Sequence, residues 1–255
     1  TIRNIGFSYH GDKNDFKVLV DDYNWDFCQI QYNYIDETNQ AGKEGLKYAH
    51  SKGIGVVIME PLRGGSLVGK MPDEIKNIWD KAGVSRSYVD WALRWLWDQH
   101  EVGVVLSGMN EESHIDENIR LACEIKPGTI TENEHRIYKE VKEAYLRLMK
   151  VGCTGCAYCL PCPAGVNIPF CFSYYNTMHL FKNKHARLQY LMFGGGATGG
   201  ENALASKCID CGKCEKACPQ HIKIRENLKI LRKEMEPWWS GPLLGIIRGV
   251  LKVKR

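Results

Sequence analysis

The chain has 255 residues and 44% apolar composition, enough to bury a sizeable core in one large domain or two unequal ones. It contains no apolar run of about eighteen residues, so no membrane-spanning helix is expected, and no secretory core is visible near Thr1. Residues 1–150 carry 19 lysines and arginines against 24 aspartates and glutamates, whereas residues 151–255 carry 15 against 6. This asymmetry predicts two modules with different surroundings.

Strands and helices are expected to alternate through the first 125 residues. The strand candidates are residues 2–8, 26–34, 53–61 and 102–109, and the helix candidates are residues 12–22, 40–52, 72–98 and 111–123. Three of the four strand candidates are nearly continuous apolar runs, which is typical of parallel strands buried on both faces. The first half is therefore predicted to be an α/β domain.

The alternation ends in the stretch KPGTITENE, which begins at Lys126. Thr131 and Glu134 have the spacing of a capping box, which predicts the start of a long helix. We place the domain boundary between Lys126 and Gly152. Beyond it, the chain shows no convincing strand, and the expected helical stretches are residues 172–193 and 220–235.

Nine of the eleven cysteines follow residue 150, and eight of these form two runs. Residues 208–219 read CIDCGKCEKACP, the C-x2-C-x2-C-x3-C-P run of bacterial ferredoxins that bind [4Fe–4S] clusters. Residues 153–163 read CTGCAYCLPCP, a near match with one residue fewer before its last cysteine. The predicted metal ligands are Cys153, Cys156, Cys159, Cys162, Cys208, Cys211, Cys214 and Cys218.

In two-cluster ferredoxins the fourth cysteine of one run reaches the other cluster. By this exchange rule, Cys218 would join the first three cysteines of the 153–162 run, and Cys162 would join those of the 208–218 run. Zinc and a single cluster are the alternatives, but zinc sites usually use two C-x2-C pairs that close one tetrahedron. The other cysteines are expected to be small core residues: Cys28, Cys123 and Cys171.

The 45 residues between Cys162 and Cys208 look helical, and this half of the chain resembles the alpha-helical ferredoxin domain found in the iron–sulfur subunit of succinate dehydrogenase. Two thiolate-bound clusters would bring negative charge into the basic half and partly offset it. We therefore expect no nucleic-acid partner.

Three stretches of the first half resemble an aldo/keto reductase. RNIGFSYH is similar to the fifth barrel strand of that family, GIGVVIMEPLRGG to the seventh, and VGVVLSGMNEESHIDEN to the eighth strand with the loop into its helix. The resemblance implies a partial (β/α)8 TIM barrel, strands 5–8, followed by an all-α ferredoxin-type domain. The predicted segments are 1–126 for the half barrel, 127–151 for a linker helix, 152–235 for the ferredoxin domain and 236–255 for a basic tail.

The resemblance also implies that NADP or NAD lies across the carboxyl ends of the barrel strands. Ser8 and Gln29 would hydrogen-bond the nicotinamide carboxamide, and Met59 stands where many members stack a tyrosine on that ring. The other implied contacts are Pro61 and Leu62 along the pyrophosphate, Ser107, Gly108 and Met109 near the adenosine phosphate, His114 near the ribose 2′-phosphate, and Glu117 and Asn118 at the adenine.

The catalytic Asp, Tyr, Lys and His of the family come from earlier strands, and none of the four can be placed in this sequence. His10, Tyr32 and Lys52 do not fill those roles. The chain opens almost directly on a strand, and four strands alone would leave open sheet edges. We therefore expect further strands from sequence upstream of Thr1 or from a second copy.

The leading hypothesis is a cytoplasmic NAD(P)H-dependent oxidoreductase with an unknown carbonyl or alcohol substrate and a protein electron-transfer partner. Nicotinamide passes two electrons whereas each cluster passes one. Either a flavin in the barrel links the two, or the clusters serve mainly as structure. The alternative hypothesis is a non-catalytic electron-transfer or docking module whose barrel remnant binds a partner enzyme.

The tail, residues 236–255, combines two tryptophans, an apolar stretch with one arginine, and a basic end. This composition predicts peripheral membrane contact or docking on a partner protein. The alternative is a tail that packs on the protein's own surface.

Overall fold

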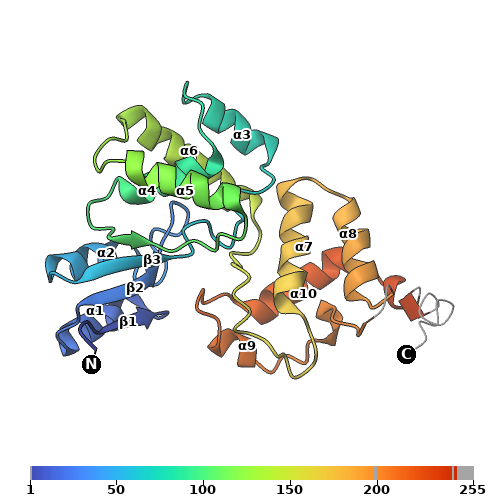
Figure 1. Ribbon diagram of the computed structural model, residues 1–255. Coiled ribbons are helices and arrows are strands. Elements are labelled where there is room, and N and C mark those ends of the chain that lie inside the picture. The colour runs from blue at the N-terminus through green and yellow to red at the C-terminus, as the bar shows by residue number, and fades with distance from the viewer. Residues whose placement is uncertain (1, 198–199, 243, 246–255) are drawn as a thin grey trace. The chain divides into compact units, whose positions relative to one another are not determined.

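The computed structural model describes residues 2–197, 200–242 and 244–245, and the chain forms two compact units, Thr1–Leu146 and Arg147–Arg255 (Figure 1). The division falls inside the interval in which the sequence places the domain boundary. None of the helices in this described part of the chain combines the length and the hydrophobicity that a bilayer crossing requires.

The first unit is built on a sheet of four parallel strands in the order β1-β2-β3-β4. The strands are β1 (Gly6–Tyr9), β2 (Phe27–Gln31), β3 (Gly55–Met59) and β4 (Val104–Val105). Ile30 and Ile58, register partners in the two central strands, are completely buried on one face of the sheet. Burial alternates along both strands, since Gln29 and Val57 on the other face are only partly buried, so the expectation of strands buried on both faces is wrong for this sheet. Because the strands are parallel, their carboxyl ends meet at one edge of the sheet. The predicted α/β fold class is confirmed.

Six helices accompany the strands in the described part of the first unit: α1 (Lys13–Asp22), α2 (Gly42–Ser51), α3 (Asp73–Asp80), α4 (Tyr88–Trp97), α5 (Glu112–Glu124) and α6 (Glu132–Leu148). The prediction of one helix over residues 72–98 is wrong, because the chain turns between α3 and α4. Gly83 has a φ of +71°, a conformation that ends a helix and favours glycine. The Ser87 hydroxyl then accepts a hydrogen bond from Asp90 N at 2.9 Å and caps α4.

Aromatic side chains from α3, α4 and α6 form much of the core of the first unit. The rings of Trp79 and Trp91 stack with their centroids 4.5 Å apart. The Tyr138 hydroxyl donates a hydrogen bond to the Trp91 carbonyl at 2.6 Å, so this buried polar group is satisfied. α6 is therefore fixed to α4 by both ring packing and a hydrogen bond.

The capping box at the start of α6 forms as the sequence predicted. Thr131 N donates to the Glu134 carboxylate at 2.8 Å, and Glu134 N donates weakly to the Thr131 hydroxyl at 3.3 Å. The carboxylate also pairs with Arg86. Burial works to raise the pKa of Glu134, but the hydrogen bonds from Thr131 and Arg86 outweigh it, and the net pKa lies below its ordinary value of 4.5.

Replacing Glu134 with glutamine is expected to lower the free energy of unfolding by about 1–2 kcal/mol at neutral pH, since the lost hydrogen bonds are charge-assisted. The native pKa lies below the unfolded one, so the unfolded chain binds more protons between the two values. The stabilisation is present above the unfolded pKa and is lost as pH falls through the native pKa. Urea unfolding at neutral pH and at about pH 3 should therefore show the difference between wild type and E134Q shrinking.

The matched control is Glu124→Gln, which removes a carboxylate from the exposed pair with Arg120 on α5. Such exposed helix pairs contribute only about 0.5 kcal/mol or less. A difference between wild type and E134Q that stays constant from neutral to acid pH would contradict the assigned role of the carboxylate.

The regular structure in the described residues of the second unit is all helical, and loops connect the helices. Its elements are α7 (Ile168–Leu180), α8 (His185–Gln189), the π-helical turn η1 (Tyr190–Gly194), the 3-10 turn η2 (Ala205–Lys207), α9 (Lys213–Lys216) and α10 (Ile224–Met235). Phe172 of α7 and Leu231 of α10 are completely buried in its core. The cysteine runs pack against that core on loops, except that Cys214 lies in the short helix α9. Cys171 and Cys28 are buried as expected, but Cys123 is exposed on α5, so the prediction of a core position is wrong for Cys123.

The helix predicted over residues 172–193 is interrupted after α7. Lys182 has a φ of +49°, which breaks the helical path. The side-chain oxygen of Asn183 then accepts a hydrogen bond from His185 N at 3.0 Å at the start of α8. The two helices therefore pack side by side as a hairpin instead of forming one rod (Figure 1).

The described part of the tail packs against the core of the second unit. Leu244 is buried in the core of that unit, and a Cβ placed on Gly195 would lie only 2.8 Å from Leu244 Cδ1. The basic end of the predicted tail falls within residues 246–255, which lie outside the described residues, as does residue 243.

Candidate functional site

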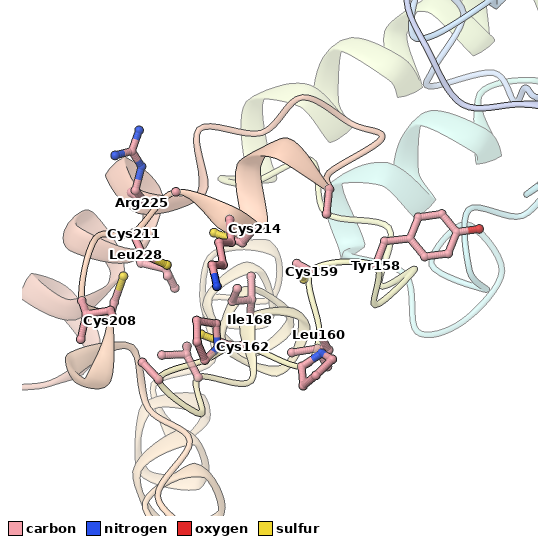
Figure 2. Close-up of a pocket in the computed structure, with 18 residues that line it drawn as sticks. Tyr158, Cys159, Leu160, Cys162, Ile168, Cys208, Cys211, Cys214, Arg225 and Leu228 are labelled. Atoms are coloured by element: carbon pink, nitrogen blue, oxygen red, sulfur yellow. The ribbon is translucent and has the colours of Figure 1, made fainter.

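One cavity in the second unit, cavity 1, has a volume of about 190 Å³ and draws its cysteines from both runs (Figure 2). Cys159 and Cys162 come from the first run, and Cys208, Cys211 and Cys214 come from the second. Their sulfur atoms gather around the same space. Burial raises the pKa of Cys214, and the charges of Glu215 and Cys208 raise it further.

A second and tighter cavity, cavity 2, has a volume of about 20 Å³. Its cysteines are Cys153, Cys156, Cys159 and Cys218, so again three belong to one run and one to the other. Burial raises the pKa of Cys159 to about 12, and the neighbouring charges of Cys153, Cys156 and Cys218 contribute to the rise. These four thiols are therefore close enough to influence one another electrostatically.

Eight thiols line the two cavities, which is the number of ligands that two [4Fe–4S] clusters require. Among the described residues, no group of three or more His, Cys, Asp or Glu side chains converges on one point where a single metal ion would sit. Four sulfurs spread around a cavity match a cubane, whose thiolates bind separate iron atoms, whereas zinc draws its ligands onto one centre. None of the eleven cysteines forms a disulfide.

Ion pairs hold the loop of the second run against α10. Lys229 Nζ lies 2.7 Å from Asp210 Oδ2, and Arg225 Nη2 lies 2.8 Å from Glu215 Oε2. Gly212 has a φ of +75°, which lets the loop turn between Cys211 and Cys214. The spacing of the second run is thus supported by α10 on one side and by a glycine turn on the other.

A different cavity, the strand-end cavity, lies in the first unit at the carboxyl ends of β3 and β4 and has a volume of about 610 Å³. Eight of the ten residues implied for nucleotide binding line it: Pro61, Leu62, Ser107, Gly108, Met109, His114, Glu117 and Asn118. The cavity is also lined by residues that the sequence did not predict, including Gly64, Gly65 and Val89. The Gly-Gly pair that ends the matched GIGVVIMEPLRGG stretch was the signal available for two of them.

One carboxamide and one carboxylate side chain of α5 are held in place at this cavity by hydrogen bonds. Asn118 Nδ2 donates to the Ser107 hydroxyl at 3.1 Å, while Asn118 Oδ1 is buried and has no hydrogen-bond partner among the described residues. Glu117 accepts a hydrogen bond from the Ser87 hydroxyl at 2.6 Å. A buried acceptor without a partner is costly, so a hydrogen-bond donor brought to Asn118 Oδ1 would be stabilising.

Ser8 and Gln29 form a separate group with Met59. Parallel pairing places Ser8 beside Gln29, and Gln29 Nε2 donates weakly to the Ser8 hydroxyl at 3.5 Å and to Met59 Sδ at 3.4 Å. None of the three lines the strand-end cavity. The structure therefore brings the ten implied residues together as two groups, one at the ends of β1 to β3 and one at the ends of β3 and β4.

A buried ion pair supports the loop that follows β3. Arg63 Nε lies 2.9 Å from Asp36 Oδ2, and the two side chains are only 4% and 12% exposed. Gln31 and Asn33 donate further hydrogen bonds to the same carboxylate oxygen, at 3.0 and 3.2 Å. The sequence reading missed this pair. It fixes the Glu60–Gly65 loop, whose residues line the strand-end cavity.

Tyr32 and Lys52, to which the sequence analysis assigned no catalytic role, instead make contacts that stabilise the fold. Tyr32 is completely buried and donates a hydrogen bond to Gln99 Oε1 at 3.0 Å. Lys52 Nζ pairs with Asp21 Oδ1 at 2.7 Å. Neither these two nor His10 lines the strand-end cavity.

Comparison with known proteins gives two family matches in this one chain. The profile of the aldo/keto reductase family matches residues 1–141, and the profile of a 4Fe-4S dicluster domain matches residues 152–222. Among curated proteins, no sequence matches the chain.

Two solved structures of the aldo-keto reductase AKR11C1 from Bacillus halodurans resemble the chain. The holo form is 20% identical with a TM-score of 0.45, over 55% of this chain and 50% of that chain. The apo form is 19% identical with a TM-score of 0.43, over 52% of this chain and 49% of that chain. The chain spans about half the length of these structures.

Proposed function

Because the chain belongs to the aldo/keto reductase family and carries a 4Fe–4S dicluster region, as its sequence predicted, we propose that it acts as an iron–sulfur oxidoreductase that binds a nicotinamide nucleotide and two [4Fe–4S] clusters. One observation carries the proposal. Each of two cavities in the second unit is lined by three cysteines of one run and the last cysteine of the other, and Cys159 lies in the wall that the two cavities share. This is the exchanged ligand set of two-cluster ferredoxins.

The protein would hold each cluster by thiolates and keep water from it by apolar walls. Cys162, Cys208, Cys211 and Cys214 would bind in cavity 1, and Cys153, Cys156, Cys159 and Cys218 in cavity 2. Ile168 contributes to the walls of both cavities and Leu228 to cavity 1. Bound clusters would supply one-electron transfer, and a bound nicotinamide would supply hydride.

The strand-end cavity would hold the nucleotide, and its volume lies in the usual range for cofactor sites. Asn118 offers its buried carboxamide oxygen to a ligand N–H, while the hydrogen bond from Ser87 fixes Glu117. Ser8 and Gln29 would present a hydroxyl and an amide to the nicotinamide end. His114 lines the cavity and would contact a ribose 2′-phosphate, which makes it the residue that decides between NADP and NAD.

The proposed substrate is a carbonyl compound or an alcohol, and the proposed partner is a protein that exchanges single electrons with the clusters. A flavin would link two-electron and one-electron transfer. No residue of this chain is assigned to acid–base catalysis. The second candidate function is an electron-transfer or docking module without nucleotide binding, in which the two cysteine-lined cavities would carry the function.

Titration of the full chain with NADPH and NADH, followed by nucleotide fluorescence, is expected to saturate for at least one of them. Replacing Asn118 with alanine removes the buried acceptor and should weaken binding by about five- to tenfold, the effect of one hydrogen bond. The matched control is Asn133→Ala on α6, whose side chain only accepts a hydrogen bond from Arg136 at 2.7 Å.

Two results would count against the nucleotide site. A linear, unsaturable signal with both nucleotides would favour the docking module. Saturable binding that N118A and N133A leave equally strong would move the nucleotide away from the strand-end cavity.

A further inference from the structure

We propose that the second unit docks on the surface of an anionic membrane through an apolar and basic face at the end of α10. The apolar part of this face, called the tryptophan face below, consists of Leu188, Phe193, Trp238 and Trp239. Their exposed fractions are 59%, 51%, 90% and 41%. Single exposed apolar residues are ordinary, but four large ones on neighbouring segments mark an interaction surface.

Several contacts keep the segments of the tryptophan face together. Arg187 Nη1 of α8 donates a weak hydrogen bond to the Glu234 carbonyl of α10 at 3.5 Å. The Tyr190 hydroxyl of η1 donates to Glu236 Oε1 at 2.6 Å. α8, η1 and the end of α10 therefore form one continuous region of the second unit, and Figure 1 shows α8 beside the orange-red end of α10.

The charge around the tryptophan face is basic. Arg187, Arg232 and Lys233 are exposed there, and the ion pairs of the described part of the second unit do not include any of the three. Two nearby carboxylates, Glu234 and Glu236, keep their negative charge but are hydrogen-bonded within the second unit, and the three cations outnumber them. Glu234 accepts from Tyr175 at 2.7 Å and lies 3.0 Å from His179 Nε2, while Glu236 accepts from Tyr190.

The positive charge around the tryptophan face also decides which partner can bind it. A second copy of the chain would bring an equally basic face, and the chain's own residues 246–255 carry four basic residues and no acidic one. Either would place like charges together. An anionic bilayer complements the basic residues, and tryptophan side chains favour the boundary between headgroups and acyl chains. This inference does not depend on nucleotide or cluster binding.

The test is co-sedimentation of the full chain with vesicles of phosphatidylcholine, with and without about one third phosphatidylglycerol. Binding is expected only to the anionic vesicles and should weaken as salt is raised. Trp238→Ser with Trp239→Ser should lower the partition coefficient by about tenfold or more, and so should Arg232→Glu with Lys233→Glu.

Matched controls come from the first unit. Val18 is 70% exposed on α1, and Val18→Ser should bind like wild type. Arg136→Glu with Lys139→Glu reverses two exposed charges on α6 and should also bind nearly like wild type. Circular dichroism melting curves establish that each variant is folded before its binding is compared.

Several outcomes would overturn the proposal. Wild type that sediments equally with both vesicle types, or with neither, would exclude an anionic membrane. Equal binding of wild type and the tryptophan variant would exclude the tryptophan face. Self-association in analytical ultracentrifugation that the tryptophan variant abolishes would assign the face to a second copy, and equally strong binding to soluble polyglutamate would assign it to an acidic protein.

Discussion

Replacing Cys218 with serine is expected to remove the same cluster as replacing Cys156, although the two cysteines belong to different runs. Both line cavity 2, whereas Cys211 lines cavity 1. Iron and acid-labile sulfide should fall from about eight to about four per chain in each single variant. The double variant C156S/C218S should stay near four, and C211S/C218S should approach zero.

This pattern separates exchange from the simpler arrangement in which each run binds its own cluster. Without exchange, C211S/C218S would retain one intact quartet and about four irons, and C156S/C218S would lose everything. Electron paramagnetic resonance of the dithionite-reduced protein should show the same remaining signal in C156S and C218S and a different one in C211S. Cys123→Ser, at an exposed cysteine outside both runs, is the matched control and should keep the full iron content.

Stoichiometric zinc in a colourless preparation of the wild type would contradict the cluster assignment altogether. Loss of all iron in every single variant would show instead that the two cavities cannot be filled independently.

Replacing Arg63 with methionine is expected to lower the free energy of unfolding by about 3–5 kcal/mol, because it leaves a buried carboxylate without its cation. Asp36 would retain the hydrogen bonds from Gln31 and Asn33, which neutral donors supply. Urea unfolding followed by near-ultraviolet circular dichroism measures the loss. NADPH affinity should fall with it, since Arg63 lies in the loop between Glu60 and Gly65 that lines the strand-end cavity.

The control for this prediction is Arg120→Met, which breaks the exposed pair with Glu124 and should cost about 0.5 kcal/mol or less. Adding Asp36→Asn to Arg63→Met removes the unpaired negative charge of Asp36 and should recover part of the lost free energy of unfolding. If R63M costs no more than R120M, the buried pair does not support the loop.

The sequence predicts the elements of this protein where a local pattern decides the outcome. All four strands overlap the strand candidates of the sequence, three of which are apolar runs, and the capping box locates the start of α6. The sequence fails where a single residue interrupts a long helical pattern, at Gly83 and at Lys182. A positive φ at a lysine has no reliable sequence signature, because the surrounding packing imposes it.

The candidate site divides in the same way. The cysteine spacing identifies the thiols because the motif is local, and the family resemblance identifies most of the strand-end cavity. The Asp36–Arg63 pair was missed because its members lie 27 positions apart and meet only when β2 and β3 pair. The exposure of Cys123 was missed for a similar reason, since only the packing of α5 decides which side of that helix faces solvent.

Cavity 1 and cavity 2 are adjacent, because Cys159 and Ile168 line both of them. If both hold redox groups, a charge added to one is felt by the other through a single layer of side chains, where screening by solvent is weak. The reduction potential of each site would then depend on whether the other site is already reduced. The first electron would enter more easily than the second, and a partner able to fill one site would not necessarily fill both.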